Sequence, residues 1–535
     1  LNLEIMQAGL SWLTVLKKRK AFQKYFDKFD AKLISNYDDN ILILEKKNRI
    51  SGRIKTVRKN KLIYDVGAGR ISSKHKTILI VLPYGIGWKS IINDDVLKLL
   101  SNVGLRIVIL AEDNMINSSD PNIIVKPLIK YQRSRFEIAF GLIRNYIFAD
   151  VDKKHSETLK LKISQFNHKH TILSIFRKLI GKPLAKNNII RAFFAWIDGN
   201  LFSDNNYKEI FDTFNPQVIF VTYPFSFYTY PVVRRGKKMN VPMIAYVPSW
   251  DNLTSKWEVP VKFDQLIVWN KIMQNEAIEF LNYKLSQVKI CGVPQFDLHY
   301  NDSLIQERKK FIQSFGGNPD KNIIIYATGT KQLSDIEPNI VEIIQIAIEE
   351  NKLKKPCQLL LRVHPRRSIS DFQNVIEKPD VFLQIPGKAS KEFMNSGYYW
   401  KSDIEDYEIL SNTLFHSDVM INVSSTITIE SCIFDTPVIN IAFDTNQDID
   451  SFKSIKRHFK YSHYKYLLNS NGVKIASSSK ELLNYINDYL DNPGLDSDGR
   501  AQIVESQCYK IDGQSSERLL KYIVDFVNEK TDYNQ

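Results

Sequence analysis

The sequence predicts an α/β protein with two parallel sheets, one in each half of the chain. Residues 77–110 have the pattern of a strand, a glycine-containing loop, a helix and a second strand, which is a βαβ unit. Apolar strand-like runs return between residues 218 and 290, and a second alternating series occupies residues 322–441. Strands that are apolar on both faces and alternate with helices are typical of parallel sheets, so two Rossmann-like domains are expected.

Three regions follow from this alternation. Residues 1–75 form a basic N-terminal extension with a helical pattern, and residues 76–300 form a first Rossmann-like domain with a helical insert at 130–210. Residues 301–535 form a second Rossmann-like domain, whose last helix is a candidate to cross back to the first. Ligands of such sheets bind at the carboxyl ends of the strands, so the active site is expected in a cleft where the domains face each other.

The composition is that of a folded, basic protein. Of 535 residues, 44% are hydrophobic and 12% aromatic, and the formal net charge is +14. A lysine-rich soluble surface explains this charge as well as an anionic small molecule or an anionic membrane does. Nucleic acid is the least favoured partner, because no zinc-finger, RNA-recognition or helix-turn-helix signature occurs.

The cysteines and the apolar runs bear on cofactors and location. The four cysteines lie far apart and have no metal-ligand spacing. No apolar run reaches the ~18 residues of a membrane span. We therefore expect a cytoplasmic protein with reduced thiols, no obligatory metal and no cofactor.

The first thirty residues carry a basic amphipathic pattern. Trp12 and Leu16 stand beside Lys17–Lys20, and Phe22 follows. Such a helix lies on an anionic membrane surface or packs on the body of the protein with its charged face in solvent, and both remain open. The first alternative predicts peripheral binding to the inner face of the plasma membrane through residues 1–30.

A strand that ends in hydroxyl residues is the most informative segment. The apolar run Val419–Val423 leads directly into Ser424, Ser425 and Thr426, and a helix follows. Free N–H groups at a helix start, together with three hydroxyls, suit a pyrophosphate without a Walker lysine. Glu430 lies one turn further along, on the face of Thr426, where it could accept hydrogen bonds from ribose hydroxyls. The alternative is simple N-capping, although Glu430 has the wrong spacing for a capping box.

A second strand end brings basic residues to the same edge of the sheet. The apolar run Leu359–Val363 carries Arg362 and is followed by His364, Pro365 and Arg366. We expect His364 to hydrogen-bond a phosphate oxygen or the leaving group, and Arg362 and Arg366 to neutralise anionic charge. A structural histidine is the alternative.

Two loops complete the candidate site. Thr328 and Gly329 follow the strand at 322–326, where small residues allow the backbone to approach a donor. Asp251 follows the strand at 243–247 of the first domain, and a carboxylate there could act as general base toward an acceptor hydroxyl. An Asx turn or helix cap explains Asp251 equally well, because Asp-Asn-x-Thr is common in turns.

Together these residues resemble the GT-B glycosyltransferases. The nearest branch is similar to the bacterial CDP-glycerol glycerophosphotransferase and surface-polysaccharide glycosyltransferase group. The resemblance runs from about residue 77 to 525 and depends on the order and spacing of five short motifs. These motifs are Ser249–Asn252, Gly292–Asp297, Arg362–Pro365, Asn422–Thr426 and Asp512–Arg518.

The resemblance implies a GT-B fold in which His364 and Ser424–Thr426 hold the nucleotide diphosphate of the donor. The chain departs from the pattern in two places. The polyol-phosphate transferases carry Trp-His-Gly where this chain has Trp-Asp-Asn at 250–252, and Asp-Tyr-Ser-Ser where it has Asn-Val-Ser-Ser at 422–425. The first departure removes a proposed catalytic histidine, which favours sugar transfer with Asp251 as the candidate base.

Sugar transfer from a nucleotide-activated donor to a surface-polysaccharide or lipid-linked glycan is therefore the first functional prediction. Transfer of glycerol phosphate or ribitol phosphate from a CDP-activated donor, as in teichoic acid synthesis, is the second. UDP-sugar 2-epimerisation uses a similar fold, but the first domain lacks the expected set of acid/base carboxylates. A non-catalytic nucleotide-sugar binding protein is the alternative from a different class, and the presence of donor motifs together with a candidate base argues against it.

Overall fold

The structure, a computed structural model, describes most of residues 76–532 and two segments before them. The two earlier segments are Asn40–Glu45 and Arg53–Arg58. The gaps within residues 76–532 are 84–93, 103, 112–119, 153–155, most of 170–186, 203–204, 257–258, 390–399, 402–403 and 446–451. By its contacts the chain divides into a unit of residues 1–70 and a unit of residues 71–535.

In the first unit the described residues form one antiparallel strand pair. β1 (Asn40–Glu45) pairs with β2 (Arg53–Arg58), and Asn40 lies opposite Arg58. The helical pattern expected for the N-terminal extension does not hold for these two strands. The basic helix predicted within residues 1–30 lies outside the described residues, so its membrane role stays a prediction.

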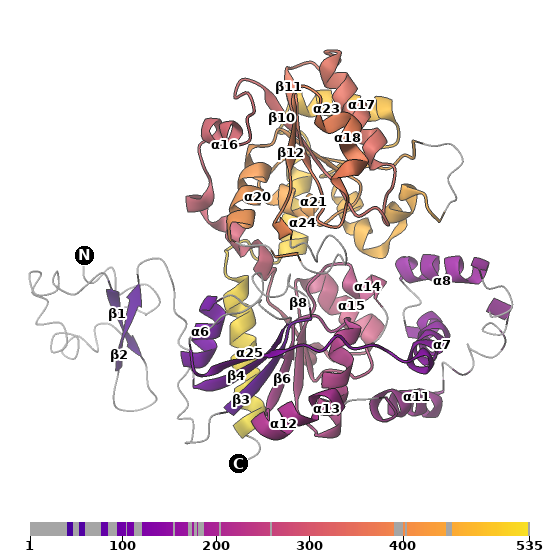
Figure 1. The fold of residues 1–535 in the computed structure, drawn as a ribbon, viewed down its shortest axis with the longest axis vertical. Helices are drawn as coiled ribbons and strands as arrows, with labels where there is room; N and C mark the ends of the chain where they lie inside the picture. Colours follow the sequence, from indigo (N-terminus) through magenta and orange to yellow (C-terminus); the bar gives the residue numbers. More distant parts are fainter. Residues whose placement is uncertain are drawn as a thin grey trace, which may run out of the picture. The chain divides into compact units, whose positions relative to one another are not determined.

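The second unit contains the two predicted parallel sheets (Figure 1). The first sheet has the order β5-β4-β3-β6-β7-β8-β9. Its strands are β3 (Lys76–Val81), β4 (Leu105–Ala111), β5 (Ile123–Pro127), β6 (Val218–Val221), β7 (Met243–Tyr246), β8 (Gln265–Val268) and β9 (Val288–Ile290). Strands are added first on one side of β3 and then on the other, so the topological switch point lies between β3 and β6.

Helices connect these strands and fill the predicted insert between β5 and β6. They are α6 (Asp94–Asn102), α7 (Arg135–Asp152), α8 (Glu157–Lys169), α11 (Asn188–Asn200), η3 (Asn205–Tyr207), α12 (Lys208–Phe214), η4 (Phe227–Thr229), α13 (Tyr230–Lys238), α14 (Asn252–Ser255), α15 (Lys271–Leu281) and η5 (Leu285–Gln287). A buried ion-pair cluster joins the insert to α13, because Arg234 contacts both Glu137 and Asp198 at 2.8 and 2.9 Å.

The second sheet is also fully parallel, with the order β12-β11-β10-β15-β16-β17. Its strands are β10 (Asn322–Ala327), β11 (Cys357–Arg362), β12 (Val381–Gln384), β15 (Val419–Asn422), β16 (Val438–Ile441) and β17 (Lys474–Ala476). This is the dinucleotide-fold order, and its switch point lies between β10 and β15. Its core includes Ile324, Leu361, Ile421 and Ile439, all fully buried.

The helices of the second domain lie before, between and after the strands of this sheet in sequence, and a short antiparallel pair, β13 (Lys388–Ala389) and β14 (Trp400–Lys401), accompanies them. The helices are η6 (Pro294–Tyr300), η7 (Asp302–Leu304), α16 (Arg308–Ser314), α17 (Glu337–Glu349), η8 (Ile369–Phe372), α18 (Gln373–Ile376), α20 (Ile404–His416), α21 (Ile427–Ile433), η9 (Ile455–Lys460), η10 (Ser462–Tyr464), α22 (Lys465–Ser470), α23 (Ser479–Asp491), α24 (Ser497–Cys508) and α25 (Ser515–Asp532).

The last helix returns to the first sheet, where two of the recognised motifs meet. α25, yellow in Figure 1, contacts α6 and β6. Asp297 accepts hydrogen bonds from the amides of Ser515 and Ser516 at 3.0 and 2.7 Å, and Arg518 donates to the carbonyl of Cys291 at 2.7 Å. Gly292 has a φ of +91°, and a Cβ there would lie 2.5 Å from Ser515 Oγ. Contacts between these two motifs therefore hold the start of α25 against the segment that follows β9.

Two simpler expectations concern thiols and membrane spans. All four cysteines are buried and unbridged. Among the helices that the structure describes, none combines the length and the apolar character that crossing a bilayer requires.

Candidate functional site

Three strands of the second sheet end level with one another beside its switch point. The register pairs Ala327 of β10 with Arg362 of β11, and Tyr326 of β10 with Ile421 of β15. The residues that follow these strands are the predicted donor residues, namely Thr328, Gly329, His364, Ser424, Ser425 and Thr426. The fold thus brings them to one edge of one sheet, where ligands of this topology bind.

The turn between β15 and α21 presents three hydroxyl side chains. Ser424, Ser425 and Thr426 are half-buried, and their hydroxyls have no hydrogen-bond partner within the part of the chain that the structure describes. Thr426 occupies the N-cap position of α21 but makes no capping bond. The N-capping alternative for this residue therefore lacks its hydrogen bond, and the three hydroxyls are available to a ligand.

A buried polar network supports this turn from below. Asn422, the last residue of β15, exchanges hydrogen bonds with Thr428 at 3.1 and 3.2 Å. Asn440 of β16 donates to Asn422 Oδ1 at 3.1 Å, and Tyr464 donates to Asn440. Because each of these side chains is fully enclosed, the network fixes where the strand ends and the hydroxyl turn begins.

His364 is held in one tautomer. Its amide donates to Thr328 Oγ1 at 2.8 Å, and its Nδ1 accepts from the amide of Arg366 at 3.0 Å. An Nδ1 that accepts must be unprotonated, so the neutral ring carries its hydrogen on Nε2. Burial lowers the pKa of His364 to about 4, and the charges of the neighbouring arginines act in the same direction. At neutral pH, His364 therefore offers an N–H donor at the switch point.

The remaining charged donor candidates differ in exposure. Arg362 is buried, donates to Gln384, and has its pKa lowered to about 10 by burial, so it stays charged. Arg366 is exposed. Glu430 keeps one oxygen 3.2 Å from His299 Nε2, while Nδ1 of the same histidine lies 2.8 Å from Ser411 Oγ. Part of the Glu430 carboxylate is thus already engaged by the segment that joins the two domains.

The loop after β10 depends on a buried ion pair that the sequence analysis missed. Gly329 donates its amide to both oxygens of Glu337, at 2.9 and 3.1 Å, and Arg367 pairs with the same carboxylate. Glu337 and Arg367 side chains are fully buried. Burial raises the pKa of Glu337 to about 7 even though Arg367 opposes that shift. The Gly329 amide is therefore committed to the protein, while the two arginines after Pro365 divide into one buried and one exposed.

Asp251 lies at the carboxyl end of β7 and is half-buried. Ser249 Oγ donates to its Oδ1 at 2.5 Å, and Ser255 Oγ donates to its Oδ2 at 2.7 Å. It occupies the N-cap position of α14 without a capping bond. Burial works to raise the pKa of Asp251, but His463 and the two serine hydroxyls outweigh it, so the pKa lies below its ordinary value. Its assignment as general base stays a prediction.

A histidine that the sequence analysis did not single out lies against this turn. His463 of η10 has its ring centroid 4.9 Å from that of Trp250 and its Nδ1 3.0 Å from Thr254 Oγ1. The only signal in the sequence is a His-Tyr pair among lysines between two strands. It could not show that residues more than 200 positions apart meet.

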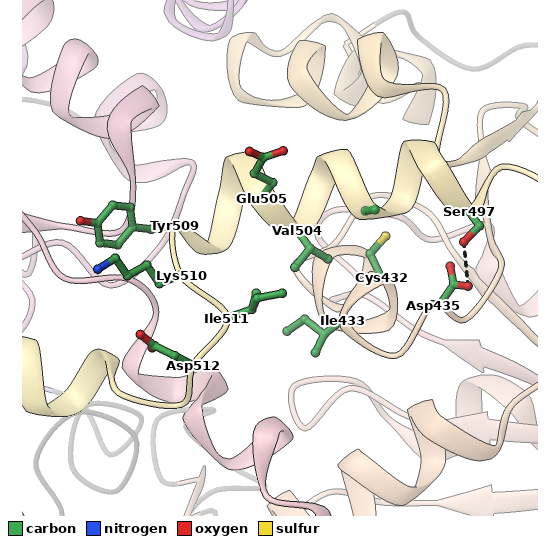
Figure 2. Close-up of a pocket in the computed structure, with 11 residues that line it drawn as sticks. Cys432, Ile433, Asp435, Ser497, Val504, Glu505, Tyr509, Lys510, Ile511 and Asp512 are labelled. Carbon is green, nitrogen blue, oxygen red and sulfur yellow. Dashed lines mark hydrogen bonds between the residues drawn. The ribbon is translucent and has the colours of Figure 1, made fainter. Parts of the chain in front are cut away.

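A cavity of about 610 Å³ lies elsewhere on the second domain (Figure 2). Its wall includes Cys432 and Ile433 at the carboxyl end of α21, together with Val504, Tyr509 and Ile511. The predicted hydroxyls stand at the other end of α21. This cavity is therefore separate from the candidate donor site.

One protein-family model matches more than half of the chain. A model described as CDP-glycerol:poly(glycerophosphate) glycerophosphotransferase matches residues 235–525, which are 291 of the 535 residues. A second model, methyladenine glycosylase, matches only residues 1–64, of which the structure describes β1 and β2. The second match covers too little of the chain to show a family.

Solved structures with a similar course of the chain share little sequence with it. A UDP-N-acetylglucosamine 2-epimerase from Listeria monocytogenes is 12% identical, with 85% of this chain and 98% of that one covered and a TM-score of 0.49. The UDP-GlcNAc 2-epimerase from Neisseria meningitidis, bound to UDP-GlcNAc, is 12% identical, with 84% of this chain and 100% of that one covered and a TM-score of 0.48. A variant of the wall teichoic acid polymerase TagF is 11% identical, with 86% of this chain and 89% of that one covered and a TM-score of 0.43. At these scores the likenesses say nothing about activity.

Two parallel α/β sheets and a last helix that returns to the first sheet are the architecture of the GT-B fold, as the sequence predicts. The chain belongs to the CDP-glycerol:poly(glycerophosphate) glycerophosphotransferase family. It is therefore an enzyme that transfers a group from a nucleotide-activated donor.

Proposed function

We propose that this enzyme transfers a sugar from a nucleotide-activated donor to a hydroxyl of a surface polysaccharide, such as a capsule, or of a lipid-linked glycan. The observation that carries the proposal is the set of unengaged hydroxyls at Ser424–Thr426, level with the Nε2–H of His364 across β10. Neutral donors converging on one edge of a sheet suit a diphosphate, whose oxygens only accept hydrogen bonds.

On the donor side, each predicted residue has a separate task. The hydroxyls of Ser424–Thr426 and the Nε2–H of His364 bind phosphate oxygens, and the charges of Arg362 and Arg366 offset those of the diphosphate. The free oxygen of Glu430 accepts from the ribose. Thr328 acts through His364, whose amide it holds, and Gly329 keeps the loop in place through Glu337. No obligatory metal ion is part of the proposal.

On the acceptor side, Asp251 stands at the end of a strand of the first domain. Its carboxylate supplies a fixed negative charge, because both oxygens already accept from serine hydroxyls. A negative charge near the acceptor hydroxyl favours the transition state, in which that hydroxyl loses its proton. Sugar transfer is the first candidate because the polyol-phosphate transferases place a histidine at this position of the motif.

Transfer of glycerol phosphate from CDP-glycerol is the second candidate, and membership of the family favours it. A donor panel separates the two. Calorimetry with UDP-, GDP-, dTDP-, CMP- and CDP-linked sugars and with CDP-glycerol gives the affinities, and transfer to a lipid-linked glycan is then followed with each donor that binds. Binding and transfer of a nucleotide sugar supports the first candidate, and exclusive use of CDP-glycerol replaces it with the second. A chain that binds no donor in the panel is not a transferase of this kind.

We further propose that the enzyme acts as a peripheral protein on the inner face of the plasma membrane. The prediction for residues 1–30 gains support from apolar side chains on the helical insert, which are more than half exposed. On α7 and α11 these are Phe136, Leu142, Ile143, Ile189, Phe193 and Trp196. Co-sedimentation with anionic vesicles tests both segments. Loss of binding on removal of residues 1–30 supports the first, loss only in Phe193→Ser with Trp196→Ser supports the insert, and no binding of the full chain contradicts both.

A further inference from the structure

Three segments that are distant in sequence meet beside Asp251. Ser156, just before α8, donates to the carbonyl of Thr254 at 2.8 Å. Ser462 at the start of η10 accepts from the amide of Glu157 at 2.8 Å and donates its own amide to Thr158 Oγ1 at 3.0 Å. The insert helix, the turn before α14 and a segment of the second domain are thus hydrogen-bonded into one cluster.

The second domain contributes an imidazole to this cluster. The ring of Trp250 packs edge-on against His463 and lies 5.8 Å from the ring of Tyr464. Tyr464 is bonded to Asn440, and Asn440 is bonded to Asn422, two residues before the first donor hydroxyl. His463 is therefore held at a defined place between the acceptor turn and the donor edge.

The hydrogen bonds around Thr254 favour one tautomer of His463. Thr254 Oγ1 donates its single hydrogen to the carbonyl of Asp251 at 3.0 Å, so toward Nδ1 of His463 it can only accept. Nδ1 must then carry the ring hydrogen, which leaves a lone pair on Nε2. None of the described residues is hydrogen-bonded to Nε2, and His463 as a whole residue is 9% exposed.

Burial keeps this ring neutral. Burial lowers the pKa of His463 to about 4, Lys162 of α8 acts in the same direction, and Asp251 acts against both. Two other titratable groups lie near the ring. A charge on His463 would lower the pKa of His458, and the ring of Tyr461 has its centroid 5.7 Å from that of His463. Lys162 donates to the carbonyl of Ser255 at 2.7 Å, and burial lowers its pKa to about 8.

Asp251 and His463 therefore differ in their capacity to accept a further hydrogen bond or a proton. Both oxygens of Asp251 are occupied by serine hydroxyls, whereas Nε2 of His463 has a free lone pair. A carboxylate near an imidazole whose second nitrogen has no hydrogen-bond partner among the described residues is suited to proton transfer through the imidazole.

We propose that His463 Nε2 accepts the proton of the acceptor hydroxyl, with Asp251 as the charge that stabilises the resulting imidazolium. This inference rests on the proposed function. In the step, the acceptor oxygen forms a bond to the electrophilic atom of the donated group, and its proton moves to Nε2. The bond from that group to the nucleotide phosphate breaks with its electron pair on the phosphate oxygen, and the proton on Nε2 is later lost to water.

Two substitutions separate this role from a structural one. In His463→Asn the side-chain amide can still donate to Thr254, as Nδ1–H does, but the atom equivalent to Nε2 is absent. In His463→Gln neither amide atom has a basic lone pair. We expect both variants to lose about a hundred- to ten-thousandfold in the turnover number of transfer, with the calorimetric donor affinity and the KM for the acceptor near wild type. His458→Gln is the matched control, because His458 is equally buried but bonds to the carbonyl of Leu333.

Each outcome decides the matter. Turnover of His463→Asn within a fewfold of wild type, while the wild type transfers, overturns the inference and leaves the proposed function intact. Absence of transfer by the wild type with every donor overturns the proposed function and this inference with it. If thermal melting shows that the asparagine variant does not fold, the glutamine variant and the pH dependence of turnover decide. The inference predicts that wild-type turnover falls at acidic pH and that the residual turnover of the variant does not. Absence of this difference also overturns the inference.

Discussion

Two strand-to-helix turns of this molecule are built from similar residues but use them differently. The turn after β15 carries Ser424, Ser425 and Thr426, whose hydroxyls have no partner among the described residues. The turn after β7 carries Ser249 and Asp251, and there serine hydroxyls donate to the carboxylate. The first turn keeps its polar groups available to a ligand, and the second satisfies them within the protein.

The difference indicates what each turn can contribute to catalysis. Unengaged hydroxyls lose only water when a phosphate arrives, so binding gains the full charge-assisted hydrogen bonds. A carboxylate that already accepts two hydroxyls is a weak proton acceptor but a well-oriented charge. The donor turn should therefore govern affinity, and the acceptor turn should govern the rate of the chemical step.

The largest expected effect is that of Asp251→Asn. This variant keeps the shape of the side chain but removes the charge that accepts the proton or stabilises it on His463. Turnover should fall by about a hundred- to ten-thousandfold while donor affinity stays unchanged, because the charge acts in the transition state. Turnover and calorimetric donor affinity are the two measurements.

Asp264→Asn is the matched control, since Asp264 accepts from the amide of Met243 at the opposite end of β7. Its turnover should match the wild type. A folded Asp251→Asn enzyme with normal turnover would reduce Asp251 to a turn residue. Normal turnover with weakened donor affinity would instead place Asp251 on the donor side.

A smaller effect is expected at the donor turn. His364→Ala and Ser425→Ala each remove one hydrogen bond to a charged phosphate, which is worth about 1.5–3 kcal/mol, or roughly ten- to a hundredfold in donor affinity. Isothermal calorimetry with the donor measures it. Ser431→Ala on the same helix is the control, because its hydroxyl already donates to the carbonyl of Ile427. Unchanged affinity in both donor variants would remove the donor site from this edge of the sheet.

Much of the fold could be predicted because buried parallel strands have a strong local signal. The sequence predicts strands between residues 218 and 290 and within 322–441, and β6, β8, β9 and β16 lie in these regions. β5 and β17 were missed. Each is an edge strand with only one neighbour and several partly exposed positions, although β9, which is also an edge strand, was detected. Edge strands need less apolar sequence, so hydrophobic periodicity detects them poorly.

The candidate site was only partly predictable for a different reason. Ser424–Thr426 and His364 follow strands directly, so the strand pattern alone assigns them to one edge of the sheet. The pair of Glu337 with Arg367 and the approach of His463 to Thr254 are contacts between distant segments. Each depends on how separate elements pack, and no spacing within the sequence encodes it.

The smallest effect is the pH dependence of stability, which arises in the second domain. His364, His458 and His463 each have a pKa lowered to about 4 by burial, against 6.5 for an exposed histidine. Between pH 6.5 and 4 the unfolded chain therefore binds more protons than the folded one, and these groups reduce stability as the pH falls through that window. Glu337 acts in the opposite sense, because its raised pKa lets the folded protein bind the extra proton between about pH 4.5 and 7.

The difference in the free energy of unfolding between the wild type and His458→Gln reports His458 alone, because the contribution of Glu337 is the same in both proteins. Glutamine keeps an N–H that can reach the carbonyl of Leu333 but does not titrate. The free energy of unfolding of the variant relative to the wild type should rise as the pH falls from 6.5 to 4, by at most about 1.4 kcal/mol per pH unit. Urea unfolding at several pH values measures the difference. A difference that stays constant with pH would mean that His458 titrates alike in the folded and unfolded chain, and that burial does not hold it neutral.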